Sequence, residues 1–522
     1  MVSTVMKTVS SFIVALYAVA FIPNSLAEQR PNIIFIMSDD HATRAVSAYG
    51  DALVATPNID RIATNGLRFD RAYVANALCG PSRATTLTGL HSHGNGFYSN
   101  EWSPDFDGKQ QTFPRLLQAA GYQTAVIGKW HLYSDPVGFD HWEVVHNVFE
   151  QGTYYNPEFR SADGIEQTTG YISEVVTDKA IDWLDTVSES DGPFMLMYQH
   201  KTPHRDWMPG PDELANWDDI SQVEEPSSLL RDLSHETRGR QEARMTISEH
   251  MTEKDVKLKR AKYLNTDQAQ LWDKAFSEGN RAYRGADMSA DERIRWKYQR
   301  YIKTYIAAVQ GMDREVGRIL DYLDERNLTE NTLIIYTSDQ GFFLGENGWF
   351  DKRWMDEVSS RVPLLMQWNG TIKPGTTTSS LVQNIDYAPT ILDAAGIKAS
   401  IPMHGVSLLP LSGSQTKNWD RDLYYHFYEN PGFHGVARHY GVRTDRYKLA
   451  YYYGNNEWEL FDLFDDPDDQ VNLYDKAEYS DIRDDLKKRL SALRDQYQVP
   501  LEDPYVPWYH GIAVRVLEWW FR

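Results

Sequence analysis

Four short apolar segments of the chain have the pattern of buried parallel strands. Their apolar residues are continuous rather than alternating, and helical stretches separate them, as is typical of strands covered on both faces. The four segments are residues 33–37, 124–127, 194–198 and 332–336. The pattern predicts an α/β fold with a large, mixed but mostly parallel sheet sandwiched by helices.

Helix signals lie between these strands. Thr56 and Pro57 form an N-cap followed by a proline in the first turn, and Gly66 follows where the helical pattern stops. Residues 113–120 repeat this arrangement. Apolar residues at helical spacing predict a long helix over 301–326 that leads into the fourth strand.

The pattern changes after about residue 415. Two aromatic, strand-like stretches at 447–453 and 458–463 precede a helical stretch at 480–497. These elements predict a smaller C-terminal subdomain, residues 416–522, in which a helix covers one face of an antiparallel sheet. The three aromatic residues near the C-terminus, Trp519, Trp520 and Phe521, are expected to dock on the core or on another subunit.

A charged segment interrupts the preceding domain, which we assign to residues 28–415. Residues 205–300 are rich in charge and poor in strand formers. We expect a mostly helical insertion here that walls the mouth of the active site, and a solvated insertion without a role is the alternative.

The first 27 residues have the pattern of a cleaved export signal. Lys7 precedes an uncharged run at 12–22, and Ser25 and Ala27 supply small residues at the cleavage positions. The run is shorter than the roughly 20 residues of a membrane-spanning helix. We therefore expect an exported protein, periplasmic or secreted, without stable membrane insertion.

Composition narrows the classes of function. Apolar residues make up 42% and charged residues 24% of the chain, which excludes a disordered or fibrous protein. The formal net charge is −21, so nucleic-acid binding is excluded, because phosphate neutralisation requires basic surface. An anionic substrate would need a local basic pocket. Aromatic residues at 13% suit a surface that contacts sugars.

Polar residues follow all four predicted parallel strands. In open α/β sheets the ligand site lies beyond the carboxyl ends of the strands. Four separate strands therefore bring polar side chains to one edge of the sheet, and these are Asp39, Asp40, Lys129, His131, His200, His204, Asp339 and Gln340.

The chain has one cysteine, Cys79, so no disulfide can form within it. Pro81 suits the first turn of a helix and places Cys79 at the helix N-terminus, where free N–H groups favour an anion. Arg83 follows about one turn later and can hold the catalytic residue or an oxyanion. A buried, inert thiol is the alternative for a lone cysteine.

The segment Cys79-Gly80-Pro81-Ser82-Arg83, continued by residues 84–89, resembles the signature of the formylglycine-dependent sulfatases of the alkaline-phosphatase superfamily. In that family a formylglycine-generating maturation enzyme oxidises the cysteine to an aldehyde during export. Residues 338–353 extend the resemblance and are most similar to bacterial sulfatases that act on glycans. The resemblance covers residues 30–475, with the insertion as its weakest part.

The resemblance implies a metal site. Asp39, Asp40, Asp339 and Gln340 supply oxygen donors of the kind that Ca²⁺ prefers, and the matured residue at position 79 joins them as a ligand. Gln340 stands where many relatives have Asn or His, and it keeps a carbonyl oxygen. The implied cofactors are thus Ca²⁺ and a formylglycine formed from Cys79.

The resemblance also implies the catalytic groups. Lys129, Lys352, Arg83 and Ca²⁺ would hold the sulfate oxygens while one hydroxyl of the hydrated aldehyde attacks sulfur. His204 would protonate the leaving sugar oxygen, and His131 would accept the proton that regenerates the aldehyde. The assignment between the two histidines stays open.

The predicted function is hydrolysis of sulfate esters on an extracellular polysaccharide or its oligosaccharides. A marine algal glycan such as ulvan or carrageenan is the leading expectation, and an N-acetylglucosamine-6-sulfatase acting on glycosaminoglycan or mucin is an alternative. A phosphodiesterase or phosphonate hydrolase of the same superfamily and a catalytically silent glycan-binding protein are the other two. Further side chains expected to contact the sugar, with rim residues of no role as the alternative, are His91, His93, Arg353, Arg438 and His439.

Overall fold

The computed structural model describes residues 30–147, 149–190, 192–412, 419–506 and 510–521. Its centre is a ten-stranded mixed sheet with the strand order β14-β2-β13-β9-β1-β8-β4-β5-β6-β7. The four predicted strands form its middle and pair in parallel. They are β9 (Thr332–Ser338), β1 (Asn32–Ser38), β8 (Phe194–Gln199) and β4 (Gln123–Gly128). The predicted fold class is confirmed.

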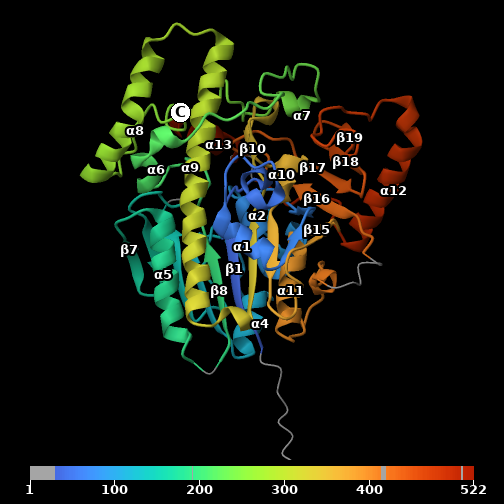
Figure 1. The fold of residues 1–522 in the computed structure, drawn as a ribbon. Coiled ribbons are helices and arrows are strands. Elements are labelled where there is room, and N and C mark those ends of the chain that lie inside the picture. Colours follow the sequence, from blue (N-terminus) through green and yellow to red (C-terminus); the bar gives the residue numbers. More distant parts are fainter. Residues whose placement is uncertain (1–29, 148, 191, 413–418, 507–509, 522) are drawn as a thin grey trace, which may run out of the picture.

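The continuous apolar pattern of these strands arises because both faces of the sheet are covered. On β1, Ile33 and Phe35 belong to the core on one face, and Ile34 and Ile36 belong to the core on the other. Helices α2 (Cys79–Thr88), α4 (Phe113–Ala119) and α11 (Tyr387–Ala394) supply the first core. Helices α1 (Pro57–Thr64), α5 (Ile172–Val187) and α9 (Ala290–Glu325) supply the second (Figure 1).

Shorter strands widen the sheet on both sides and make it mixed. Next to β4 lie β5 (His141–His146), β6 (Glu158–Ser161) and β7 (Gly164–Gln167), of which the last two pair antiparallel. Next to β9 lie β13 (Leu364–Gln367), β2 (Leu67–Phe69) and β14 (Thr376–Thr378). Two smaller sheets join β12 (Arg361–Val362), β3 (Ala72–Tyr73) and β15 (Val382–Gln383), and β10 (Phe343–Leu344) and β11 (Phe350–Asp351).

The insertion is only partly helical, so its prediction was wrong over residues 216–265. Helix α8 (Thr266–Gly285) and the start of α9 fill its second half, and α6 (Pro211–Ala215), a single 3₁₀ turn (Trp217–Asp219), α7 (Arg238–Gln241) and loops fill the first. Apolar contacts and buried ion pairs, rather than long helices, hold this first part. Arg240 of α7 contacts Asp356 at 2.9 Å and Glu459 at 2.8 Å, and its side chain is 2% exposed.

The C-terminal subdomain has the predicted secondary structure, an antiparallel sheet with a helix on one face. Its antiparallel sheet contains β16 (Leu423–Phe427), β17 (His439–Arg443), β18 (Tyr447–Tyr452) and β19 (Glu457–Asp462). Helix α12 (Ser480–Gln496) covers one face of this sheet, where Leu486 and Leu490 pack with Leu449 and Leu460. The boundary near residue 415 stays a prediction, because residues 413–418 lie outside the described part of the chain.

The predicted export signal and the C-terminal aromatic side chains also fall outside the described part of the chain. The predicted signal at 1–27 and the side chains of Trp519, Trp520 and Phe521 are not among the described residues, although α13 (His510–Phe521) is. Within the described ranges, no helix combines the length and the apolar character that crossing a bilayer requires. The remaining short helices are α3 (Ser92–Asn95) and α10 (Glu357–Ser360).

Candidate active site

The acidic residues after β1 and β9 converge on the N-terminus of α2. Asp39, Asp40 and Asp339 are fully buried, and one carboxylate oxygen of each lies within 4.8 Å of the others. Cys79, the first residue of α2, places its Sγ atom 3.5 Å from Asp39 Oδ1. The structure thus brings the strand ends and the cysteine helix to one point, as the sequence predicted.

Local packing fixes the start of α2. Gly80 donates its backbone N–H to Asn100 Oδ1 at 2.9 Å. A Cβ atom at this position would lie 2.6 Å from the Phe97 ring and 2.7 Å from Asn100 Oδ1, so only glycine allows this approach. The helix ends at Gly89, whose φ of 67° favours glycine. All residues of α2 are buried, so the cysteine is held rigidly.

The donor set fits a cation. Burial and the neighbouring Asp39 charge raise the pKa of Asp339 to about 7, and burial raises the pKa of Asp40 to about 6 despite its pairing with Lys352. Gln340 directs its amide group at Asp39 and Asp40, and its Oε1 has no hydrogen-bond partner among the described residues. Rotation of the amide about its terminal bond would turn this oxygen towards a metal. Carboxylate and amide oxygens are the ligands that Ca²⁺ prefers.

The Cys79 thiol itself is a poor nucleophile. Burial, followed by the Asp39 charge, raises its pKa to about 12. The thiolate is the reactive form of cysteine, so an unmodified Cys79 would be almost entirely protonated at neutral pH.

Two lysines face the acidic cluster. Lys352 directs its Nζ atom at both oxygens of Asp40, at 2.6 and 2.8 Å, and Lys129 forms an ion pair with Asp39. Burial lowers the pKa of Lys352, but its pairing with Asp40 outweighs burial, so the pKa is raised and the group stays charged. Both ammonium groups are buried beside Cys79 and can hold an anion there.

Arg83 lies beneath these groups rather than at the open side. Its guanidinium contacts Asp339 Oδ2 at 2.9 Å and donates to the backbone oxygen of Lys129 at 2.7 Å and to Gln199 Oε1 at 3.0 Å. The described contacts of Arg83 therefore serve to position Asp339 and Lys129. Direct contact with the sulfate stays a prediction.

The two histidines occupy different places. His204 Nδ1 donates to the backbone oxygen of Arg205 at 2.6 Å, and its Nε2 lies 3.7 Å from Asp40 Oδ2. The neutral ring of His204 therefore carries its proton on Nδ1 and leaves Nε2 free. His131 Nε2 lies 2.9 Å from Gln151 Nε2. Burial lowers the pKa of both imidazoles.

Gln151 was missed from the sequence. Its Oε1 accepts from Lys129 Nζ at 2.8 Å while its Nε2 contacts His131, so it links the two residues that follow β4. Gln151 lies in a loop with no recognisable motif, and only the fold brings it to the site. His200, which also follows a strand, instead packs on Tyr198, and the described residues offer its ring nitrogens no partner.

Among the predicted sugar contacts, Arg353 lies next to the site. It forms an ion pair with Asp351, and its Nε atom is 3.7 Å from Glu429 Oε1. His434 Nε2 lies 3.2 Å from Asp351 Oδ2. Arg353 and Asp351 flank Lys352 in the sequence and form a polar cluster with Glu429 and His434. Glu429 and His434 were not predicted from the sequence, because the C-terminal subdomain supplies them.

Of the four other predicted sugar contacts, the two buried ones, His439 and His91, were wrong in their rim location, and His93 is only partly buried. His439 is fully buried and accepts from the Met355 N–H at 3.2 Å. His91 is 2% exposed and packs on Tyr497, and His93 contacts the Tyr497 backbone oxygen at 2.9 Å. These imidazoles serve packing between the catalytic domain and the C-terminal subdomain. The fourth, Arg438, lies partly exposed and contacts Asp503 at 3.2 Å.

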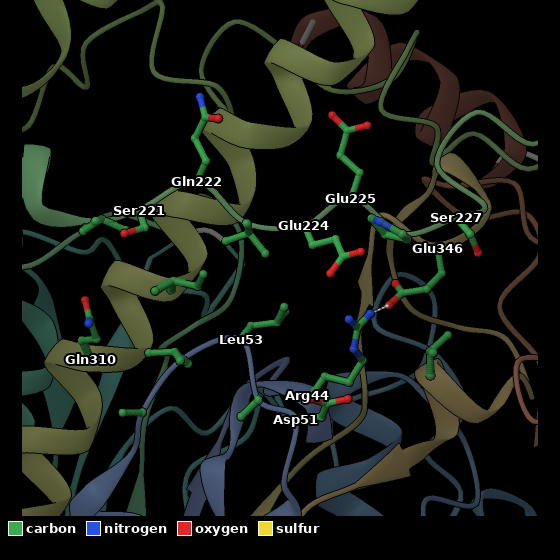
Figure 2. Close-up of a pocket in the computed structure, with 18 of the residues that line it drawn as sticks. Arg44, Asp51, Leu53, Ser221, Gln222, Glu224, Glu225, Ser227, Gln310 and Glu346 are labelled. Atoms are coloured by element: carbon green, nitrogen blue, oxygen red, sulfur yellow. Dashed lines mark hydrogen bonds and ion pairs between the residues drawn. The ribbon is translucent and has the colours of Figure 1, made fainter.

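A separate open cavity of about 1100 Å³ does not include the catalytic centre (Figure 2). Arg44 and Glu346 form an ion pair of 2.7 Å in its wall, and Leu53, Glu224 and Gln310 also line it. None of the strand-end residues lines this cavity, and its carboxylates outnumber its cations. A sulfate group is therefore disfavoured there.

Comparison with known proteins identifies the chain. The family model described as Sulfatase matches residues 31–397. The chain belongs to the sulfatase family. A second model, described as N-sulphoglucosamine sulphohydrolase, C-terminal, matches residues 345–496. The predicted family is confirmed, and the protein is a sulfuric ester hydrolase.

Individual relatives of this sulfatase differ in their similarity. An N-acetylglucosamine-6-O-sulfatase of Bacteroides thetaiotaomicron is 43% identical over 91% of this chain and 88% of the relative. An ulvan-active sulfatase of Formosa agariphila is 24% identical over 90% of this chain and 83% of the relative. A solved sulfatase in complex with its substrate D-glucosamine-2-N,6-O-disulfate is 43% identical, with a TM-score of 0.87 over 90% of this chain and 98% of the solved chain.

Proposed function

We propose that this sulfatase removes the 6-O-sulfate from N-substituted glucosamine residues of a sulfated glycan. The observation that carries the proposal is the 43% identity, over 91% of this chain, to a relative named as acting on this ester. The expectation of an algal glycan is set aside, because the ulvan-active relative is only 24% identical.

We further propose that Cys79 is converted to formylglycine by a maturation enzyme and that Ca²⁺ binds Asp39, Asp40, Asp339 and Gln340. The raised pKa of the thiol and the unpaired Gln340 oxygen support this proposal. The hydrated aldehyde would supply a hydroxyl nucleophile, and the cation would lower the pKa of that hydroxyl and offset the charge of the sulfate.

The residues of the chain would then divide the work. Lys129 and Lys352 hold the sulfate oxygens and orient the ester, because both ammonium groups are buried beside position 79. His204 can protonate the leaving O6 atom only as the imidazolium, whose second proton sits on Nε2, the ring nitrogen that lacks a backbone partner and lies 3.7 Å from Asp40 Oδ2. His131, which contacts Gln151, accepts the hydroxyl proton in the later step that regenerates the aldehyde.

Arg353 remains the proposed contact with the sugar itself. With Asp351, His434 and Glu429 it forms a charged group beside Lys352 that can both donate and accept hydrogen bonds. Such a group suits the hydroxyl pattern of a glucosamine ring, whereas a sulfate alone would be better held by cations without carboxylates.

The test compares esters that differ in one feature. Glucosamine-2-N,6-O-disulfate and N-acetylglucosamine-6-sulfate would be incubated with the wild type and with Cys79→Ser, and inorganic sulfate and the remaining sugar measured. We expect one sulfate per sugar, with the N-sulfate retained. Glucosamine-6-phosphate and sulfated galactose serve as controls. Turnover of sulfated galactose in preference to both glucosamine esters would contradict the proposal.

Export is proposed on the residues that precede the described chain. The pattern at 1–27 supports removal of a signal and a periplasmic or secreted location. The N-terminal residue of protein purified from the native cells tests this, since an intact Met1 in the active protein would contradict it.

A further inference from the structure

A row of aromatic rings crosses the C-terminal sheet on the face that carries α12. Tyr440, Tyr451 and Trp458 lie directly opposite one another on β17, β18 and β19. Neighbouring ring centroids are 5.6 and 4.1 Å apart, and Tyr474 extends the row 5.7 Å beyond Trp458. All four rings are only partly buried. We call these four residues the aromatic row.

Two cations of α12 lie over this row. Lys487 Nζ is 4.7 Å from the ring centre of Trp458 and 5.1 Å from that of Tyr474. The Arg494 guanidinium is 4.2 Å from the ring centre of Tyr440. Residues seven positions apart share one side of a helix, so α12 presents both cations to the same stretch of rings.

Both cations belong to a protein with a net charge of −21. Within the described ranges, neither Lys487 nor Arg494 forms an ion pair with a carboxylate, and their polar contacts are to the hydroxyls of Tyr474 and Tyr424 and to a backbone oxygen. By contrast, Arg489, on the same helix, pairs with Asp422. The charges of Lys487 and Arg494 are therefore available to an external anion.

We propose that the aromatic row, together with Lys487 and Arg494, is a second binding surface for a sulfated sugar chain. Tyrosine and tryptophan faces contact the C–H faces of sugar rings, and the ammonium and guanidinium groups bind the sulfates. A neutral sugar would lack the second interaction, whereas a sulfated glycan provides both. This inference rests on the proposed function, in that the chain bound is of the substrate's class.

The surface lies on the face of the C-terminal sheet opposite to the face that packs on the catalytic domain. The C-terminal subdomain that carries it lies beside the strand ends of the central sheet (Figure 1). His439, next to Tyr440 on β17, contacts the backbone of Met355, three residues beyond Lys352. Tyr440 points to the opposite face from His439, so only a chain long enough to pass around the subdomain is tethered in a way that raises its effective concentration at the active site. A monosaccharide gains nothing from such a tether.

The competing explanation is that the cations only pack α12 on the sheet. A double variant, Lys487→Gln with Arg494→Gln, separates the two explanations when compared with Lys488→Gln. Lys488 is the exposed neighbour of Lys487 and has no described contact with the rings. The binding probe is size-defined heparin, with chemically desulfated heparin as its control, and binding is measured with the Cys79→Ser background so that no turnover intervenes.

We expect the double variant to weaken heparin binding at least about tenfold, since two charge-assisted contacts are lost, and Lys488→Gln to leave it unchanged. In active protein, KM should rise for long heparin chains, while kcat and KM on the disulfated monosaccharide stay constant. Lys487→Arg should retain binding. Heparin should also protect Lys487, but not Lys488, from amine acetylation measured by mass spectrometry, and this needs no variant.

Several results would overturn the proposal. They are wild-type protein that does not bind heparin, equal binding by the double and control variants, or equal acetylation of the two lysines with and without heparin. A lowered Tm with unchanged binding would assign the cations to packing, and loss of self-association would assign the row to a second copy. Failure to desulfate any glucosamine ester would contradict the proposed function instead, whatever heparin binding shows.

Discussion

Replacing Lys352 by alanine tests the catalytic assignment most directly. The Lys352 side chain is buried, and its Nζ atom contacts both oxygens of Asp40 at 2.6 and 2.8 Å. In the proposed reaction it also faces the sulfate. Loss of one buried, preorganised donor to a developing charge costs about 3 to 4 kcal/mol of transition-state stabilisation. We therefore expect kcat/KM to fall by a factor of about 10² to 10³.

The same substitution leaves Asp40 without its cation. Burial already raises the pKa of Asp40 to about 6, and removing Lys352 raises it further, so the carboxyl becomes protonated near neutral pH. A folded-state pKa above the unfolded value means that the folded state binds the extra proton, so stability rises as pH falls. In metal-free protein, the stability deficit of Lys352→Ala relative to the wild type should thus shrink as pH falls from 8 to about 6, and stay constant below that, where Asp40 is protonated in both proteins.

The assay is sulfate release from glucosamine-2-N,6-O-disulfate, with Lys398→Ala as the matched control, because Lys398 is exposed. Circular dichroism would establish that the variant is folded, and Tm would be measured in EDTA at each pH. If kcat/KM of folded Lys352→Ala stayed within about threefold of the control, a difference below 1 kcal/mol, Lys352 would lie outside the sulfate site.

Four further predictions concern other groups. Cys79→Ser should fold like the wild type yet release no sulfate in cells with only cysteine-type maturation, and substantial turnover would argue for a phosphatase-like mechanism. Asp339→Asn should abolish the rise in Tm that Ca²⁺ produces in EDTA-stripped wild type, as well as sulfate release; an unchanged rise would move the metal site elsewhere. His439 has a pKa lowered by burial to about 4, so its stabilising effect is lost as pH falls from about 6.5 to 4, and His439→Asn should flatten the Tm profile there. Arg240→Met leaves two buried carboxylates unpaired and should lower the free energy of unfolding in urea by about 3 to 5 kcal/mol, whereas a neutral effect would show that apolar packing suffices.

The central sheet could be predicted because its strands are buried on both faces, which leaves a continuous apolar run in the sequence. Its outer strands could not, because β7 is fully exposed and β2 and β14 are three residues long. The first half of the insertion failed for a related reason. Its position depends on Arg240 reaching Asp356 and Glu459, and contacts so distant in sequence leave no periodic signal.

The same division applies to the candidate site. Residues that directly follow a strand, such as Asp39 and Lys129, could be placed because the topology of parallel strands fixes their edge. Gln151 and Glu429 lie in loops. No local sequence pattern indicates that the fold brings these two residues close to the site. His91 and His439 show the opposite error, since a histidine near a motif can be a buried packing residue, and residue type alone does not distinguish the two roles.

The burial of α2 constrains the order of events in the life of the chain. Cys79 is 1% exposed, and every residue of the helix that follows it is buried between the sheet, α11 and the C-terminal subdomain. An enzyme that oxidises this side chain needs the surrounding backbone in an extended, accessible form. The proposed maturation must therefore be completed on the newly made polypeptide, before tertiary packing closes. A protein that folded before this oxidation would stay inactive while it remained folded. Only unfolding would expose Cys79 to the maturation enzyme again.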